Sequence, residues 1–310
     1  MKRGPLRKSN TLILGTILVL AFLVPGCSRK FMVVDEPALL PPARILDHPP
    51  RVALVLGGGA FHGSAHVGVI KVLEDAHIPI DLIVGTSAGS MVGALYADFP
   101  HVDSLIPLVN HIKTSDVFDF SPFRSSEGYV SGKKLQKYLN EHLHHRNIEE
   151  LPIPFVAVAT DLDHGRSVPL AAGPVAPSVN ASCAIPYIFE PVKMYGTVFV
   201  DGGVLNNIAI DVAKQYHPLI TLAVDIMADF DTMPDFKNKT EVLQRCYRVA
   251  SHVLKEAELK QADILISPDL TGLPLLSAKD DELMLELGQK AAREALPKIE
   301  ALLIEKGISR

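Results

Sequence analysis

The segment DLIVGTSAGSMVGALYA, residues 81–97, predicts a buried strand, a sharp turn and a helix. The apolar run ends at Val84, the turn is Gly85-Thr86-Ser87-Ala88-Gly89, and apolar residues then recur at helical spacing. A serine on such a strand-to-helix turn presents its hydroxyl at the tip, and only small neighbours avoid a clash there. The helix amino terminus stabilises a developing alkoxide. We therefore expect Ser87 to be a nucleophile, with Gly85 and Gly89 permitting the turn.

A glycine-rich loop lies upstream of this turn. Gly57-Gly58-Gly59-Ala60-Phe61-His62-Gly63 follows the apolar run 52–56 and precedes helical spacing over residues 64–76. Such a loop aims several backbone N–H groups at one point beside a helix amino terminus, which favours an anion. By itself it fits an oxyanion hole, a phosphate site or a plain tight turn equally well. A dinucleotide site requires an acidic residue at the end of the second strand, whereas Asp81 begins that strand.

The remainder of the chain alternates short apolar runs with amphipathic stretches. This alternation predicts a single α/β domain over residues 51–310, with a three-layer arrangement of a mostly parallel sheet covered by helices on both faces. The runs expected to form strands buried on both faces are 52–56, 82–84, 155–159, 198–200, 219–224 and 264–266. The helical stretches are 64–76, 88–97, 131–144, 240–260 and 280–303, the last interrupted by Pro297.

A serine nucleophile needs a base, and Asp201 is the better candidate for it. Asp201 follows the apolar run 198–200 and precedes Gly202 and Gly203, which places it at a strand's carboxyl end, where open α/β sheets build their sites. A carboxylate there serves as a base if partial burial raises its proton affinity. An aspartate-glycine turn that only closes a strand is the other interpretation. No histidine downstream of Ser87 has recognisable triad surroundings. Those on polar helix faces or in connections are His101, His111, His142, His144, His145, His217 and His252.

Together these motifs resemble the patatin-like phospholipase family over residues 51–302. Gly57–Gly63 is similar to that family's oxyanion loop, Gly85–Gly89 to its nucleophile elbow and Asp201-Gly202-Gly203 to its aspartate-glycine-glycine motif. Four further segments match: Ala65–Val69, Ala159–Leu162, Ala181–Pro186 and Gly203–Asn207. Two positions depart from the commonest loop, since Ala60 replaces a frequent glycine and His62 replaces a usual arginine or lysine. A histidine is charged only below about pH 6.5, so its presence predicts a weakened or pH-gated oxyanion site.

The resemblance implies a serine acyl-ester hydrolase of phospholipase A or lysophospholipase type. It implies a Ser87–Asp201 dyad without histidine, no cofactor and no metal, and phospholipids, lysophospholipids or neutral lipids as substrates. The N–H groups of Gly57, Gly58, Gly59 and Ala88 are the expected oxyanion donors. Two rival readings stay open: an α/β-hydrolase esterase with a histidine triad, and a catalytically silent lipoprotein that binds lipid or a protein partner.

The amino-terminal residues predict export and a lipid anchor. Four basic residues precede the apolar run from Thr11 to Val24, which is short of the roughly 20 residues that span a bilayer. The run ends in Val24-Pro25-Gly26-Cys27, which resembles a bacterial lipobox, although Pro25 is an unusual occupant. We expect a signal peptide over 1–26, a lipidated Cys27, and a proline-rich tether over 27–50 with no regular element. Ser28 in place of aspartate resembles lipoproteins sent to the outer membrane.

Charge and cysteine content limit the partners. Removal of residues 1–26 would shift the formal charge from −5 to about −9, with 26 Lys and Arg against 35 Asp and Glu. An acidic protein lacks the clustered cations that bind nucleic acid phosphates. Cys183 and Cys246 are expected to be two separate buried thiols.

An aromatic segment lies between two of the expected helices. Residues 117–129 carry Phe118, Phe120, Phe123 and Tyr129 among polar residues. They predict either a lid or acyl-chain wall near the bilayer, or ordinary core packing.

Overall fold

The computed structural model describes residues 32–33, 39–43, 45–110, 112–120, 128–227, 239–275 and 279–309. These residues belong to one compact unit that runs from Phe31 to Arg310. Phe123 and His111 lie outside the described residues, as do Cys27 and residues 1–26, where we expect a signal peptide.

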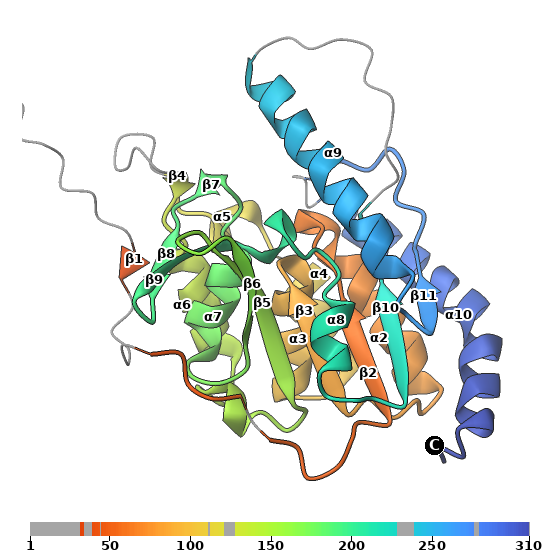
Figure 1. Ribbon diagram of the computed structural model, residues 1–310. Helices are drawn as coiled ribbons and strands as arrows, with labels where there is room; N and C mark the ends of the chain where they lie inside the picture. Colours follow the sequence, from red (N-terminus) through yellow and green to blue (C-terminus); the bar gives the residue numbers. More distant parts are fainter. Residues whose placement is uncertain are drawn as a thin grey trace, which may run out of the picture. The chain divides into compact units, whose positions relative to one another are not determined.

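A mixed sheet forms the centre of the unit, in the order β1-β8-β9-β5-β3-β2-β10-β11, with β6 paired to β5 (Figure 1). The pairs from β11 through β10, β2 and β3 to β5 are all parallel. Beyond β5 the pairs β5–β6, β5–β9 and β8–β9 are antiparallel, so the mostly parallel prediction holds for one half of the sheet. The strands are β1 (Met32–Val33), β2 (Val52–Leu56), β3 (Leu82–Thr86), β5 (Phe155–Asp161), β6 (Arg166–Leu170), β8 (Val192–Met194), β9 (Thr197–Asp201), β10 (Ile220–Val224) and β11 (Ile264–Ile266). A separate pair joins β4 (Gly128–Val130) to β7 (Tyr187–Phe189).

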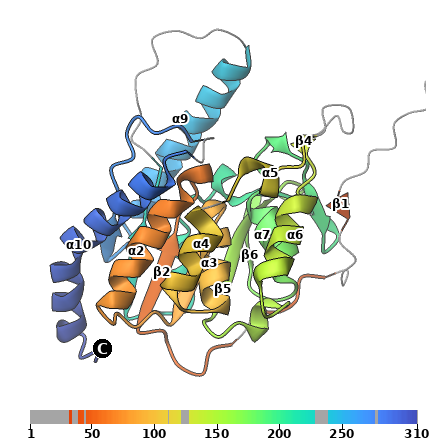
Figure 2. The same ribbon diagram turned by 180° about the vertical axis from the view of Figure 1, so that it is seen from behind.

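Helices cover both faces of the sheet, which confirms the three layers (Figures 1 and 2). The larger apolar core lies under α2 (Gly63–Asp75), α3 (Ala88–Asp98), α4 (Val102–Asn110), α6 (Lys133–His142), α7 (Val175–Ser182) and α10 (Asp281–Glu305). The smaller core lies on the other face, under α8 (Ile210–Lys214) and the end of α9 (Lys239–Leu259). Short turns of helix complete the described residues: α5 (Thr114–Val117), η1 (Ala60–His62), η2 (Ile148–Glu150) and η3 (Gly202–Val204).

Small residues let α10 pack tightly against α2. A Cβ on Gly68 would lie 2.1 Å from the carbonyl oxygen of Leu285, and one on Gly288 would lie 2.1 Å from that of Ala65. Neither backbone contact leaves room for a larger side chain. The carboxyl-terminal helix is thereby fixed against the helix that follows the glycine loop.

Several predicted elements need correction. The helix α10 runs through Pro297 without a break. Pro297 and Arg293, whose carbonyl the proline cannot bond, are both exposed, so water can satisfy that carbonyl while the apolar face stays packed. β11 is not buried on both faces, because it is an edge strand with Leu265 exposed. Met32–Val33 pairs with β8, although the proline-rich stretch predicted no regular element.

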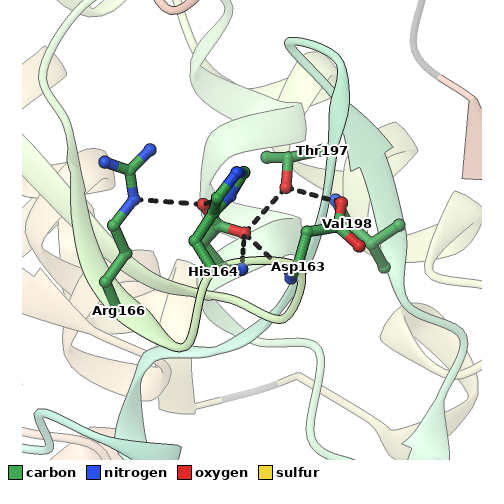
Figure 3. A network of polar contacts seen from close by, with 6 residues as sticks. Asp163, His164, Arg166, Thr197 and Val198 are labelled. Atoms are coloured by element: carbon green, nitrogen blue, oxygen red, sulfur yellow. Dashed lines mark hydrogen bonds and ion pairs between the residues drawn. The ribbon is translucent and has the colours of Figure 1, made fainter.

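A buried carboxylate holds the antiparallel half of the sheet together (Figure 3). Asp161, at the end of β5, accepts hydrogen bonds from the Thr197 hydroxyl at 2.7 Å and His164 Nδ1 at 2.8 Å. It also accepts from Arg166 Nε at 3.2 Å and from the backbone N–H of Asp163 at 3.0 Å. Burial alone would raise the pKa of Asp161, but these hydrogen bonds lower it to about 2. The Ala159–Leu162 segment therefore ties the β5–β6 turn to β9 and has a structural role.

No helix among the described residues is both long enough and apolar enough to span a bilayer.

Candidate active site

The turn between β3 and α3 holds Ser87 in a strained conformation. Ser87 has φ 53° and ψ −122°, a combination that L-residues rarely adopt and that is typical of a nucleophile elbow. Its carbonyl accepts the N–H groups of Ser90 at 2.8 Å and Met91 at 3.1 Å, which starts the helix. A Cβ on Gly89 would lie 2.1 Å from the Leu56 carbonyl oxygen, so only glycine fits there.

Ser87 and Asp201 lie in direct contact. The Ser87 hydroxyl donates to Asp201 Oδ2 at 2.6 Å, although the two residues are 114 positions apart. The other carboxylate oxygen accepts the Gly203 N–H at 2.7 Å. A Cβ on Gly202 would lie 2.2 Å from the Val158 carbonyl oxygen, which explains a glycine directly after the aspartate. Antiparallel pairing of β9 with β5 brings Asp201 level with Ala159, two strands from Ser87.

Burial makes Asp201 a better base. Its side chain is 3% exposed, and this burial raises its pKa to about 6 against the opposing effect of the two hydrogen bonds it accepts. At neutral pH the carboxylate is therefore still ionised, but it binds a proton more readily than an exposed aspartate does. A proton transferred from Ser87 would have an acceptor of suitable affinity.

No histidine takes part in this contact among the residues that the structure describes. The side chain of Ser87 bonds to Asp201, and Asp201 bonds to Ser87 and Gly203. His144 and His145 instead bond to Asp98 at 2.8 Å each, and His164 belongs to the Asp161 network. The same residues contain no cluster of three or more histidine, cysteine or acidic side chains placed to hold a metal ion.

Two side chains whose role the sequence did not reveal fix the backbone of Ser87. The Ser182 hydroxyl accepts the Ser87 N–H at 2.9 Å and donates to the Val158 carbonyl at 2.6 Å. The Cys183 thiol donates to the Ser87 carbonyl at 3.2 Å. Both residues lie in the segment Ala181–Pro186 that resembles the family. The sequence alone does not show which groups they bond, and the structure does. Cys183 is buried, whereas Cys246 is exposed, so the prediction of two buried thiols was wrong for Cys246.

The glycine loop lies against Ser87, and its N–H groups differ in availability. Gly57 N donates to the Val224 carbonyl at 3.0 Å, and Gly58 N donates to the Asn207 carbonyl at 3.2 Å. Within the described part of the chain, the Gly59 N–H has no such partner. The Ala88 N–H is one of the first N–H groups of α3, which have no acceptor inside their helix. Gly59 and Ala88 are thus the two predicted donors that remain open.

Asn207 holds the glycine loop in place through two hydrogen bonds to Gly58. Besides its carbonyl bond to Gly58, its amide Nδ2 donates to the Gly58 carbonyl at 3.3 Å. A Cβ on Gly58 would lie 2.5 Å from Asn207 Oδ1 and 3.1 Å from Ser87 Cβ. Gly58 therefore lies between Ser87 and Asn207, where a side chain has no room.

Two buried histidines support the loop from behind. His62 Nδ1 lies 3.1 Å from the Ile226 carbonyl oxygen, and His66 Nε2 lies 2.8 Å from that of Gly57. Burial lowers the pKa of His62 and lowers that of His66 to about 4. His62 therefore favours the neutral form, and it packs behind the loop, which lines the cavity at Ala60, Phe61 and Gly63.

An apolar cavity opens beside the Ser87 hydroxyl. Its walls come mainly from η1 and the start of α2, from α3, and from the segment after α7 as far as β7, with Ser64 and Asp281 as further polar lining residues. The Ser64 hydroxyl donates to Asp281 Oδ1 at 3.0 Å, so the start of α10 contributes to the cavity. The apolar lining residues are Ala60, Phe61, Ala88, Met91, Val109, Ile112, Val117, Phe118, Leu135, Cys183, Ile185 and Phe189.

The aromatic segment both packs and lines this cavity. The ring of Phe118 lies 5.4 Å from that of Phe61, 5.1 Å from that of Phe189 and 5.5 Å from that of Phe120. Phe118 is a wall of the cavity, whereas Phe120 is exposed. Phe118 therefore fits both interpretations, because it packs against other aromatic rings and lines the cavity, whereas Phe120 is not part of the core.

The sequence is similar to those of known proteins. A family model described as patatin-like phospholipase matches residues 54–214, just over half of the chain. An uncharacterized NTE family protein of Mycobacterium tuberculosis is 34% identical over 182 residues, covering 57% of this chain and 49% of that protein. A lysophospholipase of Aspergillus fumigatus is 33% identical over 190 residues, covering 59% of this chain and 12% of that protein. The chain thus matches half or less of the length of these relatives.

The fold is also found among solved structures. The crystal structure of VipD from Legionella pneumophila superimposes with a TM-score of 0.53 at 16% identity, covering 90% of this chain and 73% of that one. At this identity the likeness concerns the fold.

Proposed function

This chain belongs to the patatin-like phospholipase family, and from that premise we propose that it is a serine acyl-ester hydrolase of phospholipase A or lysophospholipase type. Ser87 is the nucleophile and Asp201 the base. The observation that carries the proposal is the 2.6 Å hydrogen bond from the Ser87 hydroxyl to a buried carboxylate, beside an apolar cavity. The similarity to a fungal lysophospholipase supports the substrate class.

The first half-reaction forms an acyl-enzyme. Asp201 Oδ2 takes the hydroxyl proton as Ser87 Oγ attacks the ester carbonyl carbon, and the carbonyl oxygen becomes an oxyanion. The N–H groups of Gly59 and Ala88 donate to that oxyanion. The protonated Asp201 then gives its proton to the departing lysolipid or glycerol oxygen as the ester C–O bond breaks.

The second half-reaction releases the fatty acid. Asp201 accepts a proton from a water molecule, which attacks the acyl carbon, and returns it to Ser87 Oγ as the acyl–serine bond breaks. The cavity walled by Phe118 and Met91 holds the acyl chain during both steps. A third donor from Gly58 would require its N–H to leave the Asn207 carbonyl; a single oxyanion donor is typically worth about 100- to 1,000-fold in turnover.

Product analysis with defined lipids tests the substrate class. Purified protein should release free fatty acid from a phospholipid or a lysophospholipid carrying one labelled acyl chain, detected by mass spectrometry. If the protein releases fatty acid from neither lipid but still reacts with a fluorophosphonate, its substrate is another acyl ester. Folded protein that neither releases acid nor reacts with a fluorophosphonate would favour a silent lipid-binding lipoprotein.

We extend the proposal to the amino terminus, where the residues support a lipid-anchored protein of the bacterial envelope, in the outer membrane. The basis is the basic start, the short apolar run and Cys27 after a small residue. Cells fed labelled palmitate should incorporate it into the wild-type chain and lose that incorporation in Cys27→Ala. Equal labelling of both proteins would exclude Cys27 as the lipidated residue.

A further inference from the structure

The helix α9 has its polar side against the protein and an apolar side in solvent. Ser251 and Lys255 are each 4% exposed. The Ser251 hydroxyl donates to the Gly203 carbonyl at 3.2 Å, and Lys255 Nζ forms a buried ion pair with Asp225 at 2.7 Å. Glu258 accepts the Ile208 N–H at 3.2 Å. These polar contacts fix the orientation of the helix on the sheet.

The opposite side of α9 exposes a continuous apolar stripe. Leu243 and Val253 are each 64% exposed, and neighbouring positions along the helix follow the same side. The stripe consists of Val242, Leu243, Cys246, Val249, Val253 and Leu254, all exposed. A helix of a globular protein normally buries such a stripe in its own core, and an exposed one marks an interaction surface.

The buried side of α9 is linked to the active site by two hydrogen bonds. Ser251 bonds to the carbonyl of Gly203, whose N–H bonds to the carboxylate of Asp201. The amino-terminal half of α9 extends past the carboxyl ends of the central strands, which is the edge that carries Ser87 (Figures 1 and 2).

A second exposed apolar patch lies at the same edge, beside the cavity. It consists of Phe120, Tyr129 and Tyr187, with the two tyrosine rings 5.4 Å apart in an edge-to-face arrangement. Phe120 stacks on the cavity wall at Phe118. The two tyrosine hydroxyls lie 3.4 Å apart, and partly exposed tyrosines suit the boundary between lipid and water. The strands β4 and β7, which carry Tyr129 and Tyr187, reach past the sheet edge at the same end as α9 (Figures 1 and 2).

The amino-terminal half of α9 is more basic than the chain as a whole. The amino-terminal half, residues 239–250, contains Lys239, Arg245 and Arg248 against one acidic residue, Glu241. The whole chain is acidic, so this basic segment is a local exception. The net positive charge of this segment attracts an anionic bilayer surface.

We propose that the exposed stripe of α9, together with the aromatic patch, docks the enzyme onto an anionic phospholipid bilayer so that a lipid can enter the cavity beside Ser87. The role given to this docking rests on the proposed function, because the acyl esters of the substrate are held in a lipid surface. The contact itself does not depend on hydrolysis.

Activity on two kinds of substrate separates docking from chemistry. The full chain with Cys27→Ser, so that no lipid anchor contributes, is compared with the same chain carrying Leu243→Ser and Val253→Ser. On vesicles of equal parts phosphatidylethanolamine and phosphatidylglycerol, the double variant should lose roughly 10-fold in rate. On a soluble short-chain ester it should match its parent. The matched control, Ile304→Ser on α10, removes an apolar side chain that is 78% exposed and should change neither rate.

A fluorescent label reports the contact without any hydrolysis. An environment-sensitive fluorophore on Cys246, in a Cys27→Ser and Ser87→Ala chain, should shift to the blue when the same vesicles are added. The same label on Ile304→Cys in a Cys246→Ser chain should not shift. Absence of a shift at Cys246 would overturn the proposal, as would a shift that grows with protein concentration without vesicles, which indicates a second copy of the chain. A vesicle-dependent shift with an inactive wild type would leave docking intact and remove the hydrolase.

Discussion

Ser87→Ala should lower kcat/KM for ester hydrolysis by about 10,000-fold or more, because the reaction loses the atom that forms the acyl-enzyme. The remaining rate would come from substrate binding and the open N–H groups of Gly59 and Ala88. The substitution removes one oxygen from a side chain that is 5% exposed, so the fold should be kept. Activity on a soluble ester and circular dichroism of the purified variant together provide the measurement.

A second serine serves as the matched control. Ser178 is buried on α7, and its hydroxyl has no hydrogen-bond partner among the described residues. Ser178→Ala should therefore keep wild-type activity and stability. A Ser87→Ala protein with more than a tenth of the wild-type rate would exclude Ser87 as the nucleophile.

The substitution Asp201→Asn should remove most of the activity and, at neutral pH, raise the free energy of unfolding. The raised pKa of Asp201, about 6, means that the folded protein binds this proton more tightly than the unfolded chain does. Protonated Asp201 contributes its full stabilisation below the pKa that it has in the unfolded chain, near 4. This stabilisation is lost as the pH rises through about 6, the pKa in the folded protein. At neutral pH the wild type therefore holds a buried charge that an asparagine does not carry.

The size of this effect follows from linkage. Between about pH 4 and about pH 8, the unfolding free energy of Asp201→Asn should gain on the order of 2–3 kcal/mol over that of the wild type. Urea unfolding of both proteins at the two pH values gives the difference. Activity should fall by about 100- to 10,000-fold, the usual contribution of a general base. A pH-independent difference in stability would mean that Asp201 is not the buried titrating group inferred here.

Local requirements explain which parts of the site could be predicted from the sequence. A positive φ at Ser87 and backbone contacts at Gly89 and Gly202 admit few residues, so the motifs around them are strongly constrained. The strand Val52–Leu56 was predicted at its observed bounds, because β-branched and aliphatic residues buried on both faces leave a continuous apolar run. The helix bounds were correct to within two residues for α2, α3, α6, α9 and α10.

Long-range contacts explain what was missed. Ser182 and Asn207 act on Ser87 and Gly58 from 95 and 149 positions away, and no local pattern encodes these pairs. Helical spacing predicted α9, but spacing does not say which side faces the core. Hydrogen bonds of Ser251 and Lys255 decide that orientation, which leaves Cys246 exposed. The antiparallel strands β6 and β8 were missed for a different reason, although each pairs with its neighbour in the sequence, β5 or β9. Arg166, Ser167 and Pro169 interrupt the apolar run of β6, and β8 has only three residues.

The reaction of Ser87 with a fluorophosphonate, followed by mass spectrometry over a range of pH, tests the dyad most directly. A Ser87–Asp201 dyad predicts a single modified residue, Ser87, whose labelling rate falls as the pH drops through about 6, and folded Asp201→Asn protein that labels hardly at all. Labelling of Asp201→Asn at the wild-type rate, or of wild-type protein with no change across that pH range, would contradict it.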